Sequence, residues 1–376
     1  MIKVALVSFG FADYCIPLAN GLAERAQVTY LFGQKGAKTN FSSLHPKVSL
    51  RQFDEPRLRQ IGLQIKCMVR LAAEIRKLNP DVIHLQHGHT WFNLIALPLL
   101  KHYPLVCTIH DVTPHPGDKL ARKTPYWVQR LGFQQARQIV VHGQSLKQLA
   151  KAHLGIPAER INSVPMIANT TVPLMNGTIA HPKKTKDILF FGRIFEYKGL
   201  RYLIEAEPLI TAQIPEARIV IAGTGDNLDQ YCKLMVHPEK FVIHNHHIPV
   251  EEMTTLFNEA DLIALPYIEA SQSGIVPIAY RFGKAVVATR IGSLPDAIED
   301  GHTGLLVPPS NSQALASAIV RLLKDDEARE KMGQNGRIKM ETECSPDAVA
   351  ALTLSVYQKS IATEFSSHGK RDTNSL

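Results

Sequence analysis

Two cations in the second half of the sequence are spaced to bind a diphosphate. The stretch F-F-G-R-I-F-E-Y-K-G-L, residues 190–200, places Arg193 and Lys198 between the end of an apolar run and the start of a helical pattern. Cations at this spacing on a turn can contact a diphosphate from two sides, the arginine through its planar guanidinium group and the lysine as a point charge. Two solvated loop cations are the alternative interpretation of the pair taken alone.

A carboxylate, Glu269, stands in a second loop of this kind. It follows the apolar run D-L-I-A-L-P and precedes S-Q-S-G, after which I-V-P-I-A-Y-R-F has helical spacing and Gly283 can end the helix. Ser273 or Gly274 at the start of that helix would leave backbone N–H groups free, and such helix starts bind phosphate. Glu269 therefore lies where open α/β sheets bind their ligands.

Apolar runs alternate with helical patterns along the whole chain. The predicted strands are 3–9, 27–32, 81–86, 105–110 and 138–142 in the first half, and 187–192, 218–223, 241–245, 261–266, 285–289 and 304–308 in the second. Helices are expected over 59–78, 126–137, 198–213, 251–259, 311–324 and 346–361. This alternation predicts an α/β fold with two Rossmann-like halves, each a parallel sheet covered on both faces.

The predicted organisation is two domains joined by a linker. With 376 residues the chain is long enough for two domains of ordinary size. The stretch 165–187 is rich in Pro, Asn, Thr and Lys and has no periodicity, which indicates a linker. We predict an N-terminal Rossmann-like domain over 1–170, a C-terminal one over 171–345, a helix over 346–362 and a disordered polar tail over 363–376.

Composition and charge favour a cytoplasmic protein with two electrostatically different halves. Residues 1–180 hold 21 Lys+Arg and 9 Asp+Glu (+12), whereas residues 181–376 hold 21 and 25 (−4), which together give the net charge of +8. The five cysteines are scattered without Cys-x-x-Cys spacing, which suits reduced thiols. No stretch approaches the roughly 18 to 20 apolar residues of a membrane span, and the apolar opening is a first strand, not a signal peptide.

Two common nucleotide-binding motifs are absent. Gly10 stands alone after the first strand, A-G-T-G-D at 222–226 lacks the third glycine of the dinucleotide fingerprint, and the chain has no P-loop. Hydride transfer with a nicotinamide cofactor and P-loop ATP hydrolysis therefore lose support. Nothing in the sequence predicts a nucleic-acid partner.

The ordered set of motifs resembles the family 4 glycosyltransferases. The set consists of G-R…K-G, then E-A-S-Q-S-G, then G-K-A-V-V-A-T-R-I-G-S-L-P-D-A-I-E-D-G-H-T-G-L-L-V-P-P, and the likeness spans roughly residues 1–360. It implies the GT-B architecture, with two Rossmann-like domains facing across a central cleft. In that architecture the C-terminal domain holds a nucleotide-diphosphate sugar, the N-terminal domain holds the acceptor, and a C-terminal helix returns to the first domain.

The resemblance implies roles for individual residues. Arg193 and Lys198 match the pair that neutralises the donor diphosphate without a metal, and Glu269 and His110 match residues beside the transferred sugar. These four form the predicted catalytic set. The remaining predicted donor contacts are Gly10, His247, Ile248, Ser271, Ser273, Gly274 and Ile275.

The family's second glutamate, which commonly binds the ribose, is replaced by Pro277. This departure leaves ribose recognition to another group. No second carboxylate with a nucleophile role is evident, so the resemblance implies a retaining front-face substitution, unlike the paired carboxylates of retaining glycosidases. The function predicted is transfer of a sugar to a glycan or lipid-linked acceptor in polysaccharide or glycolipid synthesis. A sugar-nucleotide epimerase and a non-catalytic binding relative are the alternatives.

Two histidine clusters raise the question of a metal. They are His84, His87 and His89, and His244, His246 and His247. Histidine clusters can bind zinc. However, no Cys, Asp or Glu completes either set at ligand spacing, so we expect satisfied or cleft-lining polar residues and no metal cofactor.

The predicted helix over 59–77 has a core stripe and a basic face. The stripe comprises Ile61, Ile65, Met68, Ala72 and Ile75. The basic face comprises Arg59, Lys66, Arg70 and Lys77. Such a face can rest on anionic lipid headgroups, with each charge contributing about 1 kcal/mol, or it can be a solvated helix surface. The first interpretation predicts a lipid-linked acceptor and a peripheral position at the inner face of the cytoplasmic membrane.

Overall fold

The computed structural model describes residues 1–34, 39–112, 125–168 and 185–368, and the chain divides into two compact units. The first unit contains the elements before residue 168 together with the last helix, and the second contains the elements between them. The predicted boundary at 170/171 and most of the predicted linker lie outside the described residues.

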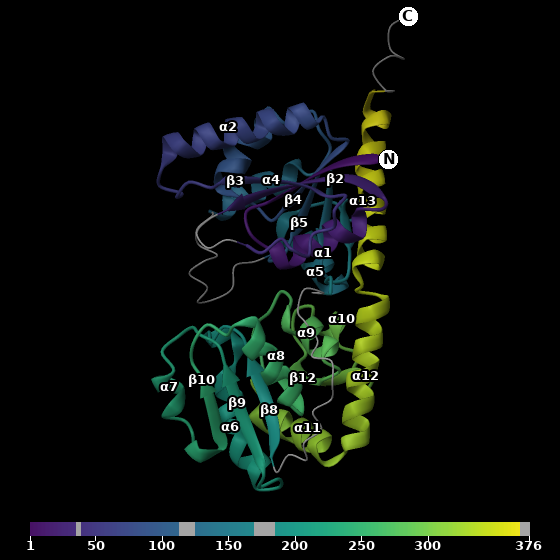
Figure 1. Ribbon diagram of the computed structural model, residues 1–376. Coiled ribbons are helices and arrows are strands. Elements are labelled where there is room, and N and C mark those ends of the chain that lie inside the picture. The colour runs from purple at the N-terminus through teal and green to yellow at the C-terminus, as the bar shows by residue number, and fades with distance from the viewer. Residues whose placement is uncertain (35–38, 113–124, 169–184, 369–376) are drawn as a thin grey trace, which may run out of the picture. The chain divides into compact units, whose positions relative to one another are not determined.

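A parallel sheet of seven strands forms the centre of the first unit (Figure 1). Its order is β3-β2-β1-β4-β5-β6-β7, with bounds Ser49–Asp54, Ala26–Gln34, Ile2–Ser8, Val82–Gln86, Leu105–Ile109, Gln138–Val141 and Ile161–Ser163. The outermost strands, β3 and β7, were not predicted. The residues of β3 are mostly exposed and lack an apolar pattern, and β7 has only three residues, so neither carries a sequence signal.

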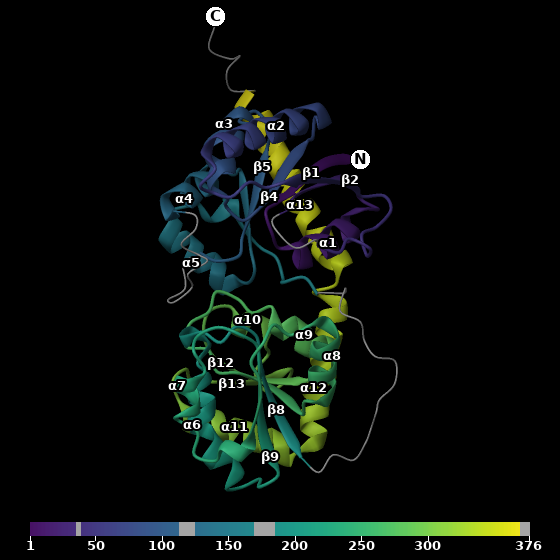
Figure 2. The ribbon, with the colours of Figure 1, turned by 60° about the vertical axis from the view of Figure 1, so that its left-hand side comes forward.

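Alternate residues of this sheet face two different cores. Val4 and Leu6 point to a core shared with α1 (Ala12–Leu22) and α13 (Pro346–His368), whereas Ala5 and Val7 point to a core shared with α2, α4 and α5. These three helices span Ile61–Leu78, Tyr126–Gln135 and Gln144–Leu154, and η1 (Phe92–Ala96) and α3 (Leu97–Leu99) lie on the same face. Figures 1 and 2 show α13 running along the sheet beside α1. Period-two burial thus produces two layers of helices.

The second unit repeats this plan around a six-stranded parallel sheet. Its order is β10-β9-β8-β11-β12-β13, with bounds Phe241–His244, Ala217–Ala222, Lys186–Phe191, Leu262–Leu265, Ala285–Thr289 and Gly304–Val307. Phe190 faces the core made with α6 (Leu200–Thr211) and α11 (Ser312–Lys324), while the next residue, Phe191, packs against Phe257 of α8 (Val250–Glu259). The other helices are α7 (Asp229–Cys232), α9 (Ile275–Arg281), α10 (Leu294–Ala297) and α12 (Asp326–Thr342).

The last helix ends later than the sequence predicted. It continues to His368 rather than ending at 362, because the residues T-E-F-S-S-H include neither Gly nor Pro to stop it. The rest of the predicted tail lies outside the described residues. The longer helices α1, α5 and α12 were also not predicted, and neither were the short helices α3, α7 and α10. Among the described residues, no helix has both the length and the apolar character needed to cross a membrane.

Candidate functional site

The loop after β8 brings Arg193 to the carboxyl edge of the second sheet. A Cβ added to Gly223 would lie 1.8 Å from the Gly192 carbonyl oxygen, so glycine at 223 allows the β8 and β9 loops to meet. Arg193 is exposed, its guanidinium carbon lies 5.2 Å from the centre of the Phe195 ring, and its Nη2 donates to Tyr197 Oη at 3.2 Å. The cation is therefore held by an aromatic face and a phenol.

Lys198 ends the 3-10 turn η4 (Glu196–Lys198) that leads into α6. Gly199 has φ 66°, and a Cβ there would lie 1.9 Å from the Pro266 carbonyl oxygen. Glycine at this position therefore lets the turn pack directly on the segment after β11. As a result, Lys198 Nζ lies 3.7 Å from the centre of the Tyr267 ring and 5.1 Å from that of Tyr197. These are cation–π distances.

Tyr197 joins the two predicted loops. Its carbonyl oxygen accepts hydrogen bonds from the backbone N–H groups of Ile268, at 2.9 Å, and of Glu269, at 3.4 Å. The same residue accepts from Arg193 through its hydroxyl group. The pair Arg193 and Lys198 was predicted from one motif and Glu269 from another, and the structure brings the two motifs together around this one tyrosine.

Tyr267 packs beneath Lys198 and connects it to the turn before α9. Its ring is buried under Lys198, its hydroxyl lies 3.2 Å from Ser273 Oγ, and its carbonyl oxygen accepts from Thr289 Oγ1 at 2.6 Å. Burial raises the pKa of Tyr267 to about 12, so the phenol is neutral at physiological pH. A neutral ring here keeps its π face available to the lysine.

The helix after Glu269 begins and ends where the sequence predicted. Gly274 is the residue before α9, and Ile275 N donates to Ser273 Oγ at 3.3 Å. Gly283, with φ 63°, follows its last turn. Ser271 is buried and its carbonyl oxygen accepts from Ser293, so its backbone is fixed. The exposed Gly274 and half-buried Ile275 are the members of this turn nearest to solvent.

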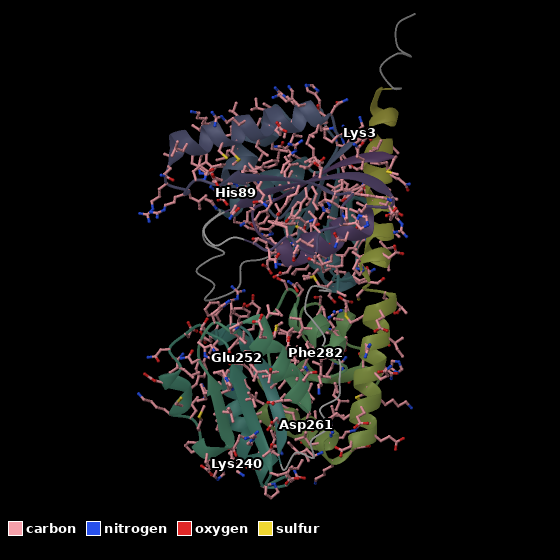
Figure 3. The ribbon with its side chains drawn as sticks, viewed as in Figure 1. Lys3, His89, Lys240, Glu252, Asp261 and Phe282 are labelled. Atoms are coloured by element: carbon pink, nitrogen blue, oxygen red, sulfur yellow. The ribbon has the colours of Figure 1, made fainter. Side chains whose placement is uncertain are left out.

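His247 and Ile248 lie on the loop between β10 and α8, where His247 is exposed. The neighbouring His244 and His246 hydrogen-bond the two carboxylate oxygens of Glu252 at 2.9 and 2.8 Å. Glu252 is labelled in Figure 3. The first turn of α8 brings Glu252 back to this cluster, a contact that the spacing of the sequence did not indicate. The histidines are nevertheless satisfied polar residues, as expected. Within the described ranges, no group of His, Cys, Asp and Glu is arranged to hold a metal ion.

Two predicted residues lie in the first unit. Gly10 has φ 153° and open space around its Cβ position. His110 follows β5 and is 1% exposed, because the Phe11 ring stacks on its imidazole at 4.2 Å and 7°. His110 Nε2 donates to Gln86 Oε1 at 3.2 Å, and its Nδ1 is buried with no hydrogen-bond partner among the described residues. Burial and the neighbouring histidines lower the pKa of His110 well below its ordinary value, so the imidazole is neutral.

The other histidines of this edge have mainly structural contacts. His84 accepts from Thr108 through Nε2 at 2.8 Å and donates from Nδ1 to Tyr357 of α13 at 2.7 Å. His89 Nε2 lies 3.3 Å from Glu55, and its Nδ1 accepts from Phe92 N (Figure 3). The buried Nδ1 of His87 has no hydrogen-bond partner within the part of the chain that the structure describes.

The buried imidazoles of His84 and His142 indicate that the first unit is destabilised by acid. Burial lowers the pKa of His84 to about 3 and of His142 to about 4, against 6.5 for an ordinary histidine. Each is neutral when folded and takes up a proton on unfolding below pH 6.5. The free energy of unfolding should therefore be greatest above that pH. It should fall by up to about 1.4 kcal/mol per pH unit per histidine as the pH decreases toward 4. Unfolding can be followed by the fluorescence of Trp91 and Trp127, the two tryptophans of the chain, both in this unit.

The matched variants are His142→Gln and His102→Gln. His142→Gln should reduce the dependence of the free energy of unfolding on pH by about the contribution of one histidine. His102→Gln, at an exposed site, should leave this dependence unchanged. A free energy of unfolding that is constant between pH 6.5 and 4.5 would contradict the assignment of these imidazoles as neutral.

The basic face of α2 differs in part from the prediction. The helix begins at Ile61, so Arg59 lies in the preceding turn and does not share the face. Lys66, Arg70 and Lys77 lie within about 40° of one another at 100° per residue, and all three are exposed. Met68, Ala72 and Ile75 are buried as predicted, but Ile61 and Ile65 are 57% and 40% exposed.

The reason for this difference is a buried polar residue. Gln64 is fully buried and its Nε2 donates to the Pro56 carbonyl oxygen at 2.6 Å. The buried face is thereby rotated toward Gln64 and Leu71. An apolar pattern cannot detect this rotation, because glutamine is counted as a surface residue.

Sequence reasoning also missed Tyr197 and Tyr267. Each stands next to or near a predicted residue, in E-Y-K-G and Y-I-E, but aromatic residues beside charged ones are common. Only the fold shows that both rings face the same lysine.

Comparison with known proteins places most of the chain in one group of enzymes. The family model described as Glycosyltransferase Family 4 matches residues 10–171, and that described as Glycosyl transferases group 1 matches residues 175–339. A D-inositol 3-phosphate glycosyltransferase of Corynebacterium glutamicum (strain R) is 33% identical over 191 residues, which are 49% of this chain and 46% of that protein. The chain thus matches about half the length of this relative.

Two solved structures share the fold. Sucrose-phosphate synthase from Thermosynechococcus elongatus has a TM-score of 0.75 at 17% identity, over 96% of this chain and 100% of that one. HepE from Anabaena, in complex with UDP-glucose, has a TM-score of 0.68 at 18% identity, over 98% of this chain and 100% of that one. The two parallel Rossmann-like sheets match the GT-B structures, as the sequence predicted.

Proposed function

Because the chain belongs to the family 4 glycosyltransferases, we propose that it transfers a sugar from a nucleotide-diphosphate sugar to an acceptor with retention of configuration. The observation that carries this proposal is the assembly of two cations and a carboxylate around Tyr197. Arg193 and Tyr197 are joined by a hydrogen bond, and Glu269 is tied to the same tyrosine through its backbone. The alternative of two independent solvated cations does not account for this common support.

In the proposed reaction, Arg193 and Lys198 contact the diphosphate. Both cations are already fixed on aromatic faces, so they need little reorganisation as negative charge develops on the departing phosphate. The backbone of the turn at Ser273, Gly274 and Ile275 is proposed to complete the phosphate contacts, with Ser271 fixing the turn. His247 and Ile248 are proposed to lie beside the nucleotide base.

At the sugar end, Glu269 is proposed to lie beside the anomeric carbon, where positive charge develops as the bond to phosphate breaks. The departing phosphate oxygen then accepts the proton of the acceptor hydroxyl group on the same face. Gly10 and His110 of the first unit remain proposed contacts of the transferred sugar. With Pro277 at the position of a second glutamate, the ribose must be held by other groups.

For the acceptor, we propose a glycan or a lipid-linked molecule used in polysaccharide or glycolipid synthesis. The exposed cations of α2 support a peripheral position at the inner face of the cytoplasmic membrane. None of the five cysteines, all of which lie in the described ranges, forms a disulfide, which suits a reducing compartment. HepE binds UDP-glucose, so UDP-glucose is a suitable first donor to test.

A thermal-shift screen of nucleotide-sugars tests the proposal, since a ligand that binds only the folded chain raises its apparent stability. The donor found is then offered with a panel of glycan and lipid-linked acceptors. Transfer with retained anomeric configuration is the expected result. Interconversion of the free nucleotide-sugar would identify an epimerase instead, and tight binding without turnover would identify a non-catalytic relative.

Transfer should not require a divalent cation. Arg193 and Lys198 supply the positive charge that a metal would otherwise provide. We expect the initial rate in excess EDTA to equal that in the untreated enzyme within about twofold. A rate that vanishes with chelator and returns with Mg²⁺ or Mn²⁺ would overturn the metal-independent mechanism.

A further inference from the structure

A strip of buried polar side chains crosses the face of the first sheet that packs on α1 and α13. His84 and Gln86 of β4 lie on this face, and the parallel register sets them beside Val106 and Thr108 of β5, with His110 two residues further along. The four polar side chains are at most 2% exposed. Polar groups buried in this way lower stability unless they are hydrogen-bonded, so the strip depends on bonds among its own members.

Four hydrogen bonds connect this strip to the last helix. His110 Nε2 lies 3.2 Å from Gln86 Oε1, and Gln86 Nε2 lies 3.1 Å from His84 Nε2. The same His84 nitrogen lies 2.8 Å from Thr108 Oγ1, and His84 Nδ1 lies 2.7 Å from Tyr357 Oη. Tyr357 belongs to α13, which packs against β4 and β5, and its side chain is fully buried. A continuous chain of bonds therefore leads from α13 to the imidazole of His110.

The direction of these bonds assigns one proton to each ring. The Gln86 carbonyl oxygen accepts from His110 Nε2, so the Gln86 amide nitrogen donates to His84 Nε2. His84 Nε2 then carries no proton, and His84 Nδ1 donates to Tyr357 Oη. Burial lowers the pKa of both imidazoles, which keeps each ring at a single proton. In His110 that proton is on Nε2, and Nδ1 carries a lone pair.

The tautomers of the two histidines are coupled through the glutamine. Turning the Gln86 amide over would place its nitrogen at His110 and its oxygen at His84, and every donor in the chain would become an acceptor. The Tyr357 oxygen favours the first arrangement, because it provides an acceptor for the His84 Nδ1–H. The hydrogen bond at one ring nitrogen thus decides which nitrogen of a more distant ring is protonated.

Core packing alone does not account for this strip. Apolar residues of similar volume could fill the same positions without the cost of burying polar groups. The lone pair on His110 Nδ1 is buried with no hydrogen-bond partner among the described residues, although the ring is held by Phe11 on one face. The residue follows β5, at the carboxyl edge of the sheet, where open α/β sheets bind their ligands. A free acceptor at this edge is suited to a hydroxyl group of a ligand.

We infer that Tyr357 is a positioning residue for sugar transfer, because through His84 and Gln86 it holds His110 in the tautomer whose Nδ1 can accept a hydrogen bond from a hydroxyl group of the transferred sugar. The inference rests on the proposed function for the identity of that hydroxyl group. The chain of bonds itself belongs to the protein without ligand. Tyr357 does not touch the sugar and acts only by excluding the tautomer that would present an N–H group to it.

The tautomers can be measured directly in the full-length protein without substrate. In protein labelled with ¹⁵N at histidine, protonated and unprotonated ring nitrogens have well-separated NMR frequencies. The signals that disappear in His110→Gln and in His84→Gln assign the two rings. We expect the proton on Nε2 in His110 and on Nδ1 in His84. The opposite pair of tautomers in the wild-type protein would overturn the inference, whatever the variants do.

Tyr357→Phe tests the relay because it removes the hydroxyl group and keeps the ring. The His84 Nδ1–H loses its acceptor, so we expect His110 to become a mixture of its two tautomers. The turnover number should fall about five- to tenfold, as for the loss of one hydrogen bond, while the dissociation constant of the nucleoside diphosphate stays unchanged. A variant that was merely destabilised would not redistribute the proton of His110.

Tyr30→Phe is the matched control, since Tyr30 is a fully buried tyrosine of the same core whose hydroxyl group lies 3.0 Å from Ser8 Oγ. It should keep the His110 tautomer and the turnover number of the wild type. An unchanged His110 tautomer in Tyr357→Phe, or a changed tautomer with normal turnover, would overturn the positioning role. A changed tautomer in a protein whose wild type transfers no sugar would support the relay and overturn the proposed function instead.

Discussion

Glu269→Gln should lower the turnover number about 100-fold or more while leaving the affinity for the nucleoside diphosphate nearly unchanged. The carboxylate is proposed to act on the positive charge that develops at the sugar as the bond to phosphate breaks, so its effect belongs chiefly to the transition state. The nucleoside diphosphate has no sugar and should not sense the substitution. Because the Tyr197 carbonyl oxygen bonds the Glu269 backbone and not its side chain, glutamine can keep the loop in place.

The measurement pairs the turnover number with the dissociation constant of the nucleoside diphosphate. Glu251→Gln, which neutralises an exposed carboxylate on α8, is the matched control and should behave as wild type. If Glu269→Gln turned over normally, Glu269 would be a structural loop residue. The catalytic role would then pass to His110, whose Nδ1 has no partner in the described ranges and is the next candidate to contact the sugar.

The parts of the fold that could be predicted are those in which a sequence pattern is typical of one kind of helix, strand or turn. Every strand of the second unit was predicted, because each is an apolar, often β-branched run with a clear end. Gly283 was predicted as a helix terminator because the left-handed conformation after a helix favours glycine. The edge strand β3 could not be predicted, since its exposed residues share no apolar pattern.

The candidate site was predictable residue by residue but not as an assembly. Arg193, Lys198 and Glu269 come from two loops that are distant in sequence, and nothing in either motif specifies their common support. That support depends on Gly199, whose missing side chain lets one loop contact the Pro266 carbonyl oxygen. The only signal in the sequence for a close approach of two backbones is a glycine, and many glycines occur for other reasons.

The cation Arg193 should affect both binding and rate, which distinguishes it from Glu269. Arg193→Ala removes a bidentate donor from the proposed diphosphate site and leaves the Tyr197 hydroxyl without this donor. The diphosphate is present in the donor, in the transition state and in the released nucleotide, so affinity for all three should decrease. Negative charge on the leaving phosphate is greatest in the transition state, so we expect the turnover number to fall about 100- to 1,000-fold as well.

Arg193→Lys and Arg201→Ala make this prediction specific. Lysine keeps the charge but not the planar guanidinium group, so it should recover only part of the binding and rate lost in Arg193→Ala. Arg201, an exposed arginine of α6 paired with Glu205, lies on the same segment and should be dispensable. Titration calorimetry with the nucleoside diphosphate and steady-state kinetics give the two readouts. Weakened nucleotide binding in Arg193→Ala, set against unchanged nucleotide binding in Glu269→Gln, would place the cation at the phosphate end of the donor and the carboxylate at the sugar end. If Arg193→Ala bound the nucleoside diphosphate as tightly as wild type, the guanidinium would not contact the phosphates, and Lys198 with the α9 turn would have to bind them without it.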